Sequence, residues 1–447
     1  MRTRLVVAMS AIAVLGAARP LSAAGPFELT GFNPRNKSMA GAQTAIADDY
    51  TATFYNPALL ATRHSLNFGA ALSVVYPNTT IALEQQLAED SPYQPELPGF
   101  EGGAALGFDF PVGGKIGDRL AIGLGVYLPA TEVARIRTLD PMVPQFYLWE
   151  SGMGRLEVMP AVAVRWFDWL TTGVGIRATG GLIGPTRFQV DPVAGTESHR
   201  EFDTALKYQI APTMGIALGP LFGLRLGGVY RGALGMPIDF PSHIGVDGTD
   251  IEAEIRFGSI NIYSPHTISI GAAYTFLDNR ITLSVDLQYL RWSDAPDPSV
   301  QFGIDTSGND LDRLGIGDSL DIPAPGLERT VVPGFQDTLV PRAGLEFFPV
   351  EFLAVRCGYF YRPTPLPNQT SGSNYVDNNT HGLTSGVGLT FQDPLEAFAN
   401  PITIDASAQV LILAERSARK DDASDPVGNW KAGGQIFDFA IAVTYSY

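Results

Sequence analysis

The sequence predicts an all-β fold, a transmembrane antiparallel β-barrel of about 14 strands whose lumen holds an N-terminal hatch, or plug. Three observations predict it. The chain closes on an alternating segment, Phe437 to Tyr447, in which every odd position is large and apolar. The same alternation recurs many times through residues 63–447. The first 24 residues have the anatomy of a secretory signal, which favours a membrane barrel over the edge strand of a soluble sandwich.

Residues 1–24 are expected to form that signal peptide. Arg2 and Arg4 give it a positive start, residues 5–18 form an apolar run, and small residues follow, with cleavage before or after Ala24. The alternative is a membrane anchor. The run is too short for one, because a spanning helix needs about 20 apolar residues.

Composition narrows the class further. Hydrophobic residues make up 45% of the chain and charged residues only 17%, while 48 glycines and 33 prolines suit many strands and turns. The net charge of −16 argues against nucleic acid as a partner, and the lone Cys357 rules out an internal disulfide framework. We find no nucleotide-binding or hydrolase motif, so no catalytic residue, metal or cofactor is expected.

The alternation defines the expected strands. In one example, Ile281, Leu283 and Val285 alternate with Thr282 and Ser284, and the second set would line a polar lumen. The count comes to about fourteen, an even number as bacterial barrels require. The expected spans are 64–77, 101–112, 119–131, 154–167, 170–190, 202–219, 222–240, 251–276, 279–293, 337–348, 351–363, 381–392, 400–416 and 431–447.

The connections between these strands differ in length. Short turns are expected at the periplasmic end. Long loops are expected outside the cell, at 78–100, 132–153, 294–336, 364–380 and 417–430, whereas the loops near 191–201 and 241–250 look short.

Residues 25–62 do not show the strand pattern and are expected to fold back into the lumen as a hatch. The alternative is a disordered tail. The hatch is favoured because Phe27, Phe32, Phe54 and Tyr55 would otherwise lie in water. The barrel itself then spans residues 63–447.

Three segments, in order, carry a family resemblance. Residues 45–58 end on Asn56-Pro57-Ala58, Trp292 closes one strand, and residues 356–367 run from an arginine to a Pro-x-Pro-Leu-Pro segment. Together they resemble the FadL-type transporters of the bacterial outer membrane, which carry long-chain fatty acids and other hydrophobic compounds, including toluene and other aromatic hydrocarbons. The matches span nearly the whole chain beyond the signal.

The resemblance implies a mechanism of passive uptake. A hydrophobic ligand would be caught at the outer surface, enter an apolar pocket, shift the hatch and leave sideways where the third strand kinks. It implies as partners the ligand, outer-membrane lipid, lipopolysaccharide and the barrel-assembly machinery, with the protein a monomer in the outer membrane. The alternatives are a general porin for polar solutes and, more remotely, an outer-membrane enzyme.

The kink is expected at Leu128-Pro129-Ala130, which is similar to a Tyr-Ser-Pro-Phe-Gly segment of the family. Pro129 has no N–H and cannot donate to the strand ladder, so it belongs at an edge or a distortion. The alternative is that the strand simply ends there. The glycine of the family is absent, because Ala130 and Thr131 follow the proline instead.

Two arginines are expected to point into the lumen. Arg356 and Arg362 share a strand face with Phe360, and Cys357 lies on the lipid side. Each arginine would either hold a ligand carboxylate or pair with Asp48 or Asp49 of the hatch. The residues expected to bind the ligand or to gate the path are Phe32, Asp48, Asp49, Phe54, Tyr55, Asn56, Pro57, Ala58, Leu128, Pro129, Ala130, Arg356, Phe360 and Arg362.

Overall fold

The computed structural model describes most of the chain after the expected signal peptide. The described residues are 27–62, 65–112, 119–129, 140–150, 156–183, 186–191, 196–202, 205–246, 252–298, 301–307, 333–370, 372–393, 400–422 and 425–447. The predicted signal at 1–24 lies outside them.

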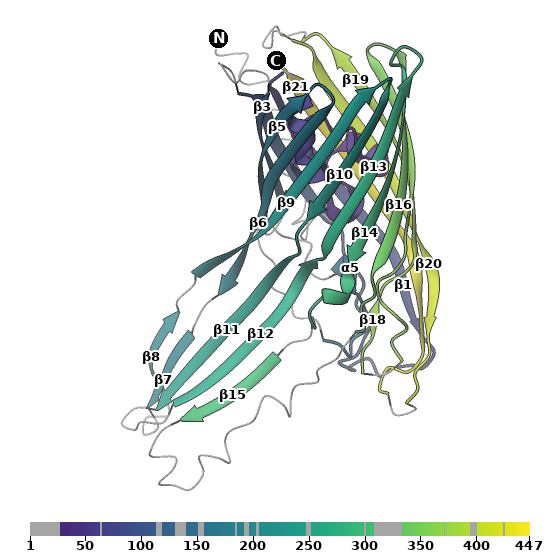
Figure 1. Cartoon of the computed structure of the whole chain (residues 1–447). Helices are drawn as coiled ribbons and strands as arrows, with labels where there is room; N and C mark the ends of the chain where they lie inside the picture. The colour runs from purple at the N-terminus through teal and green to yellow at the C-terminus, as the bar shows by residue number, and fades with distance from the viewer. Residues whose placement is uncertain are drawn as a thin grey trace, which may run out of the picture.

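The wall is a closed antiparallel barrel of fourteen strands, which confirms the predicted fold class (Figure 1). Because some of these strands are interrupted, we call each complete wall strand a stave. The last strand pairs with the first along its whole length, from Asn67 opposite Ser446 to Leu83 opposite Trp430. Closure pairs the edge strands that an open sheet would expose, as a membrane requires.

Ten staves are single strands and four consist of two strands each. The single staves are β1 (Asn67–Leu83), β2 (Glu101–Pro111), β3 (Leu120–Pro129), β5 (Glu157–Phe167), β14 (Ile281–Arg291), β16 (Thr338–Val350), β17 (Leu353–Arg362), β19 (Thr380–Phe391), β20 (Ile402–Ala418) and β21 (Trp430–Ser446). The double staves are β6 (Leu170–Ile183) with β7 (Thr186–Asp191), β8 (Thr196–Phe202) with β9 (Ala205–Leu221), β10 (Leu224–Arg231) with β11 (Leu234–Val246), and β12 (Glu252–Ser264) with β13 (His266–Phe276).

The period-two pattern explains the two faces of the wall. In β21, Phe439, Ile441 and Val443 are exposed on the outer surface, whereas Asp438 and Ala442 are buried on the inner face. Large apolar side chains outside and small or polar ones inside are typical of a barrel in lipid. Cys357 is exposed, as expected for the lipid side.

The two ends of the barrel differ. The C-terminus and short turns, such as those at 222–223 and 277–280, lie at the upper end in Figure 1, which we assign to the periplasm. At the other end, four strands run beyond the barrel and form a five-stranded sheet with β15 (Gln301–Ser307), in the order β8-β7-β11-β12-β15. We call this sheet the outer arm.

The outer arm differs from the expectation of short loops near 191–201 and 241–250. Their tips are short, but the strands on either side continue well past the barrel (Figure 1). Part of the expected loop 294–336 also belongs to the arm, because β15 pairs with β12. Alternation reports strand character and does not reveal where a strand leaves the membrane.

Short elements cover the outer mouth. They are β4 (Gln145–Phe146), α5 (Tyr147–Glu150), the 3-10 turn η3 (Trp292–Asp294) and β18 (Tyr375–Val376), with β4 and β18 paired in parallel. Apolar side chains from these elements and from several barrel strands pack together in a mouth cluster. Its buried aromatic members are Phe146, Tyr147, Trp149, Trp292, Phe360, Tyr375 and Trp430, and Tyr93, Tyr263 and Phe335 pack against them.

Residues 27–62 lie inside the barrel as short helices (purple in Figure 1). They are α2 (Phe27–Thr30), α3 (Pro34–Ser38), α4 (Ala52–Tyr55) and the 3-10 helix η2 (Pro57–Thr62). Asn33 caps α3 by accepting a hydrogen bond from the Asn36 backbone, and Pro34 occupies the first helical position. In the described part of the chain, no helix is both long and apolar enough to cross a membrane.

Candidate functional site

Wall glycines let the hatch approach the barrel backbone. At eleven inward positions, an added Cβ would lie closer than 3.0 Å to a hatch atom; we call these positions the glycine girdle. They are Gly69, Gly107, Gly123, Gly125, Gly173, Gly215, Gly227, Gly271, Gly344, Gly358 and Gly386. They come from ten of the fourteen staves. The hatch also contacts β5, β14, β20 and β21, so every stave touches it.

Asn56 ties the hatch to itself and to the wall. Its side-chain nitrogen donates to the carbonyl of Thr44 (2.8 Å) and to that of Ile216 on β9 (3.0 Å). Its side-chain oxygen accepts from the Ala58 backbone (3.2 Å). Pro57 and Ala58 then pack against Gly173 of β6. The Asn-Pro-Ala segment is therefore a structural joint between the hatch and the wall.

The hatch has an aromatic core that packs against β3. Phe27 packs against Phe54 (ring centroids 5.4 Å apart) and against Tyr127 of β3 (4.4 Å). Phe32 stacks near Phe54, and its backbone N–H donates to the Tyr55 hydroxyl (3.2 Å). All five rings are buried.

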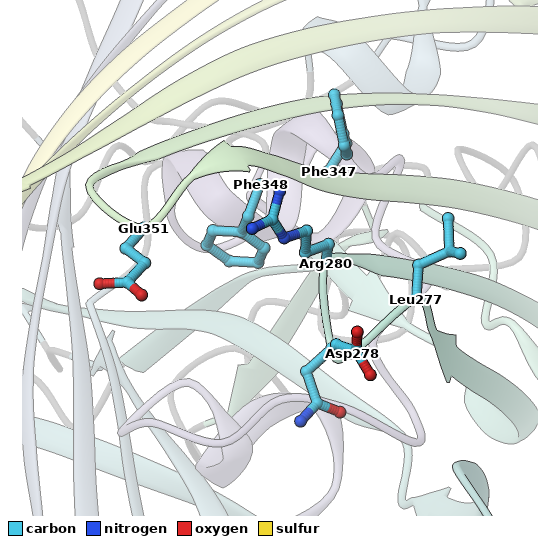
Figure 2. Close-up of a pocket in the computed structure, with 7 residues that line it drawn as sticks. Leu277, Asp278, Arg280, Phe347, Phe348 and Glu351 are labelled. Carbon is cyan, nitrogen blue, oxygen red and sulfur yellow. The ribbon is translucent and has the colours of Figure 1, made fainter.

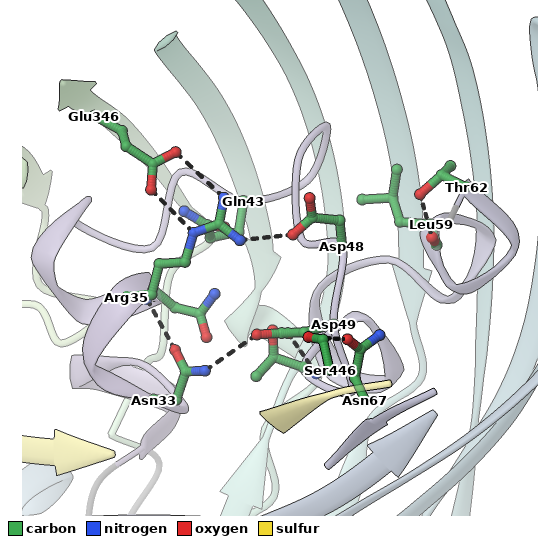
Figure 3. Close-up of polar contacts among 12 residues, drawn as sticks. Asn33, Arg35, Gln43, Asp48, Asp49, Leu59, Thr62, Asn67, Glu346 and Ser446 are labelled. Atoms are coloured by element: carbon green, nitrogen blue, oxygen red, sulfur yellow. Dashed lines mark hydrogen bonds and ion pairs between the residues drawn. The ribbon is translucent and has the colours of Figure 1, made fainter. Parts of the chain in front are cut away.

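A chain of charges joins the hatch to the wall. Arg35 of the hatch binds Asp48 (2.6 Å) and also Glu346 of β16 (3.1 Å), as Figure 3 shows. Glu346 in turn accepts from Arg356 of β17 (2.7 Å), which also binds Asp405 of β20. All of these side chains are largely shielded from water, which favours charge-assisted hydrogen bonds with fixed geometry.

This network corrects one expectation. Arg356 does point into the lumen, but it does not pair with Asp48 or Asp49 directly; Arg35 stands between them. Asp49 is used inside the hatch, where it accepts from the backbone and hydroxyl of Thr51. Arg35 was missed because its wall partner is 311 residues away. The signal was present as a cation in the hatch facing acids at inward strand positions.

A second buried pair involves the closing strand. Lys37 of α3 binds the carboxylate of Asp438 (2.6 Å), and both side chains are almost fully buried. Lys37 also donates to Thr30. Because an unpaired buried charge is costly, this pair links the position of the hatch to the presence of β21.

Further wall groups hold the hatch backbone. Asp286 of β14 accepts from the N–H groups of Gln43 and Thr44 (2.9 Å each). Arg342 of β16 donates to the carbonyl of Ala40 (2.9 Å). Backbone contacts of this kind carry no sequence signature in the hatch, so a single sequence does not reveal them.

Arg362 lies toward the outer end and serves the loop that follows β17. It forms a two-pronged ion pair with Asp377 (3.0 Å for each bond) and donates to Thr380. The expected pairing of Arg362 with Asp48 or Asp49 is therefore wrong. Phe360 packs beneath the guanidinium of Arg342, 4.8 Å from it.

The third stave is regular as far as the structure describes it. Leu128 lies opposite Ala104, and Pro129, the last residue of β3, lies opposite Gly103. Ala130 lies outside the described residues. The inward kink at Pro129 therefore stays a prediction.

A hollow of about 850 Å³ opens at the periplasmic rim, away from the hatch. Figure 2 shows Arg280 and Phe348 beside Glu351 between two turns. The backbone carbonyl of Arg280 accepts from the Phe348 N–H (2.8 Å). Arg280 is therefore a positively charged residue at the periplasmic rim, outside the lumen.

A closed fourteen-stave wall with an apolar outer surface and a hatch across its lumen defines a plugged transmembrane barrel, the class found in bacterial outer membranes. More particularly, the chain has the FadL-type fold. It superposes on a Pseudomonas aeruginosa FadL homologue with a TM-score of 0.58 at 17% identity, over 92% of this chain and 98% of that one.

Other comparisons agree. The Pseudomonas putida toluene transporter TodX matches with a TM-score of 0.56 at 14% identity, over 94% and 99% of the two chains. Alkane uptake protein A of Marinobacter nauticus is 28% identical over 190 residues, which is 42% of this chain and 38% of that protein. The aligned region thus spans under two thirds of that relative. No family model matches the sequence. The predicted resemblance is confirmed at the level of the fold.

Proposed function

We propose that this protein carries hydrophobic molecules passively across the outer membrane: alkanes, aromatic hydrocarbons or long-chain fatty acids. The observation that carries the proposal is the hatch, which touches every stave and whose core is aromatic. A wall-to-wall hatch suits a path that opens only when a ligand displaces it. A steady open pore for polar solutes, the alternative, would need the hatch to be elsewhere.

Capture would begin on the outer arm. Its five strands continue beyond the outer mouth of the barrel, so the outer arm stands where a ligand from outside would first meet the protein (Figure 1).

The ligand would then pass the mouth cluster and reach the hatch. In our proposal Phe32, Phe54 and Tyr55 contact it there, and Asp48, Asp49 and the Asn56-Pro57-Ala58 joint set how far the hatch moves. Exit would be sideways beside Leu128-Pro129-Ala130, close to the ring of Tyr127. A lipid-like molecule then avoids the periplasmic water, and no energy source is needed.

The proposed partners follow from the membrane. They are the hydrophobic ligand, outer-membrane lipid with lipopolysaccharide in the outer leaflet, and the barrel-assembly machinery, with the protein acting as a monomer. Residues 1–24 would direct export and residues 25–62 would act as the movable hatch inside the 63–447 barrel.

Uptake by a deletion strain tests the proposal. Cells lacking the gene should take up radiolabelled hexadecane, toluene or oleate more slowly, and the wild-type gene should restore the rate. A polar sugar of similar mass should enter equally well in both strains. Unchanged uptake of all three hydrophobic probes in a strain without paralogues, or steady conductance of the purified protein in a planar bilayer, would refute it.

A further inference from the structure

A cavity of about 330 Å³ lies between the hatch and the turn that joins β9 to β10. It is on the periplasmic side of the point where Thr44 of the hatch touches Gly227. Figure 3 labels three of its lining residues on the hatch, Asp48, Leu59 and Thr62. A cavity of this size falls at the lower end of the range of small-molecule sites.

The lining is apolar apart from two opposite charges and a hydroxyl. Ala45, Ile46 and Leu59 of the hatch lie opposite Ala217 of β9, and Leu218 also borders the cavity. The hydroxyl of Thr62 and the carboxylate of Asp48 complete the hatch side, and Arg225 of β10 supplies the cation.

The charges of Asp48 and Arg225 differ in whether a partner neutralises them. Asp48 is already bound by Arg35 at 2.6 Å. The guanidinium of Arg225 is half-buried and has no ion pair or side-chain hydrogen bond with the residues that the structure describes. A cation without a partner among the described residues, at the edge of a cavity that also has apolar side chains, is complementary to an anion with an apolar tail.

A β-bulge in β9 lies opposite Arg225. The pairing of β9 with β10 shifts register between Leu224 and Leu226, because β9 has an extra residue at Gly219-Pro220. Gly219 has φ +111°, and an added Cβ there would lie 3.2 Å from the Arg225 Cα. Bulges of this kind redirect side chains and recur beside binding sites. Gly219 and Pro220 themselves line the cavity.

The geometry points to a binding site for the carboxylate end of an aliphatic monocarboxylic acid, on the periplasmic side of the hatch. Arg225 binds the carboxylate, and the apolar lining covers the first methylenes. The charge of Asp48 in the same cavity disfavours a dianionic phosphate more than a carboxylate with a single charge. The inference rests on the proposed function and adds to it, since acids acquire a holding site at the hatch that hydrocarbons lack.

Photo-crosslinking of the purified full-length protein in mild detergent tests this site. The probe is dodecanoate with a diazirine near its carboxyl end, and the uncharged comparison is the matching 1-dodecanol. Mass spectrometry then maps labelled peptides. We expect dodecanoate to label residues 41–62 and 213–231, and Arg225→Gln to reduce that labelling at least tenfold. Arg225→Lys should keep most of it, and Arg280→Gln, at the rim, should keep all of it.

The outcomes separate this site from the transport function. Absence of dodecanoate labelling at these peptides in the wild type, or equal labelling of Arg225→Gln, would overturn the inference. So would dodecanol labelling that matches dodecanoate labelling. Hexadecane uptake by cells carrying Arg225→Gln should equal that of the wild type. A loss of hexadecane uptake in the deletion strain would still support transport even if the acid site fails.

Discussion

At the residue scale, a few side chains fasten the hatch to itself and to the wall. The Asn56 side chain forms hydrogen bonds with one carbonyl and one N–H group of the hatch and with one carbonyl of the wall. Arg35 and Lys37 each reach an acid more than 300 residues away in sequence. Single residues thus determine where the hatch sits in the barrel.

Asn56→Ala should loosen the hatch. It removes three hydrogen bonds and leaves buried groups unpaired, at a cost of about 2 kcal/mol or more. The measurement is the rate at which a protease cleaves within residues 27–62, together with the thermal midpoint in detergent. Asn56→Asp keeps the bond to Ala58 but turns a carboxylate oxygen toward the carbonyls of Thr44 and Ile216, so it should loosen the hatch at least as much as Asn56→Ala. Equal protease resistance of all three would contradict the role as a joint.

Arg356→Ala separates two possible roles of that arginine. It leaves the buried Asp405 without its ion pair and Glu346 with Arg35 alone. We expect faster hatch proteolysis and a lower thermal midpoint, because losing one partner of a buried pair costs about 3–5 kcal/mol. Affinity for oleate should change no more than affinity for oleyl alcohol. A selective loss of oleate binding would assign Arg356 to the ligand instead.

Lys37→Met should destabilise the protein, since it leaves the fully buried Asp438 unpaired. Adding Asp438→Leu should recover much of the loss, because both charges are then gone. The heat-induced mobility shift of the barrel in a detergent gel measures both. If the double variant melts below either single variant, the pair contributes more than charge balance.

At the scale of elements, the strands could be predicted and the hatch contacts could not. Alternation is a local signal, so β14 and β21 were placed to within a few residues. The pairing of Arg35 with Glu346 depends on the closed barrel, which brings distant segments together. The same holds for the outer arm, whose strands alternate like those of the wall.

The glycine girdle makes an element-scale prediction. Gly215→Leu should push Asn56 away from β9 and displace the hatch, because an added Cβ would overlap it. Cells with this variant should become sensitive to vancomycin, which intact outer membranes exclude. Gly99→Leu is the control, since nothing lies within 4 Å of that position. Equal vancomycin resistance of the two variants, at equal protein levels, would mean that the girdle tolerates side chains.

At the scale of the whole molecule, the barrel closes without the hatch, and the hatch blocks the lumen. The wall is completed by pairing of its first and last strands, and that pairing does not involve residues 27–62. Deleting 27–62 should therefore leave a folded barrel with the same β content by circular dichroism. Its conductance in a planar bilayer should rise to that of an open pore. A variant that stays closed would show that other segments block the lumen.

The pair of Lys37 and Asp438 also bears on biogenesis. The hatch precedes the barrel in the chain, yet the acid that neutralises its buried lysine lies in the last strand of the barrel, 401 residues later. Until the final strand is in place, a seated hatch would hold an uncompensated charge in a dry interior. We expect the hatch to settle only as the barrel closes, so that an unfinished barrel is also an unplugged one.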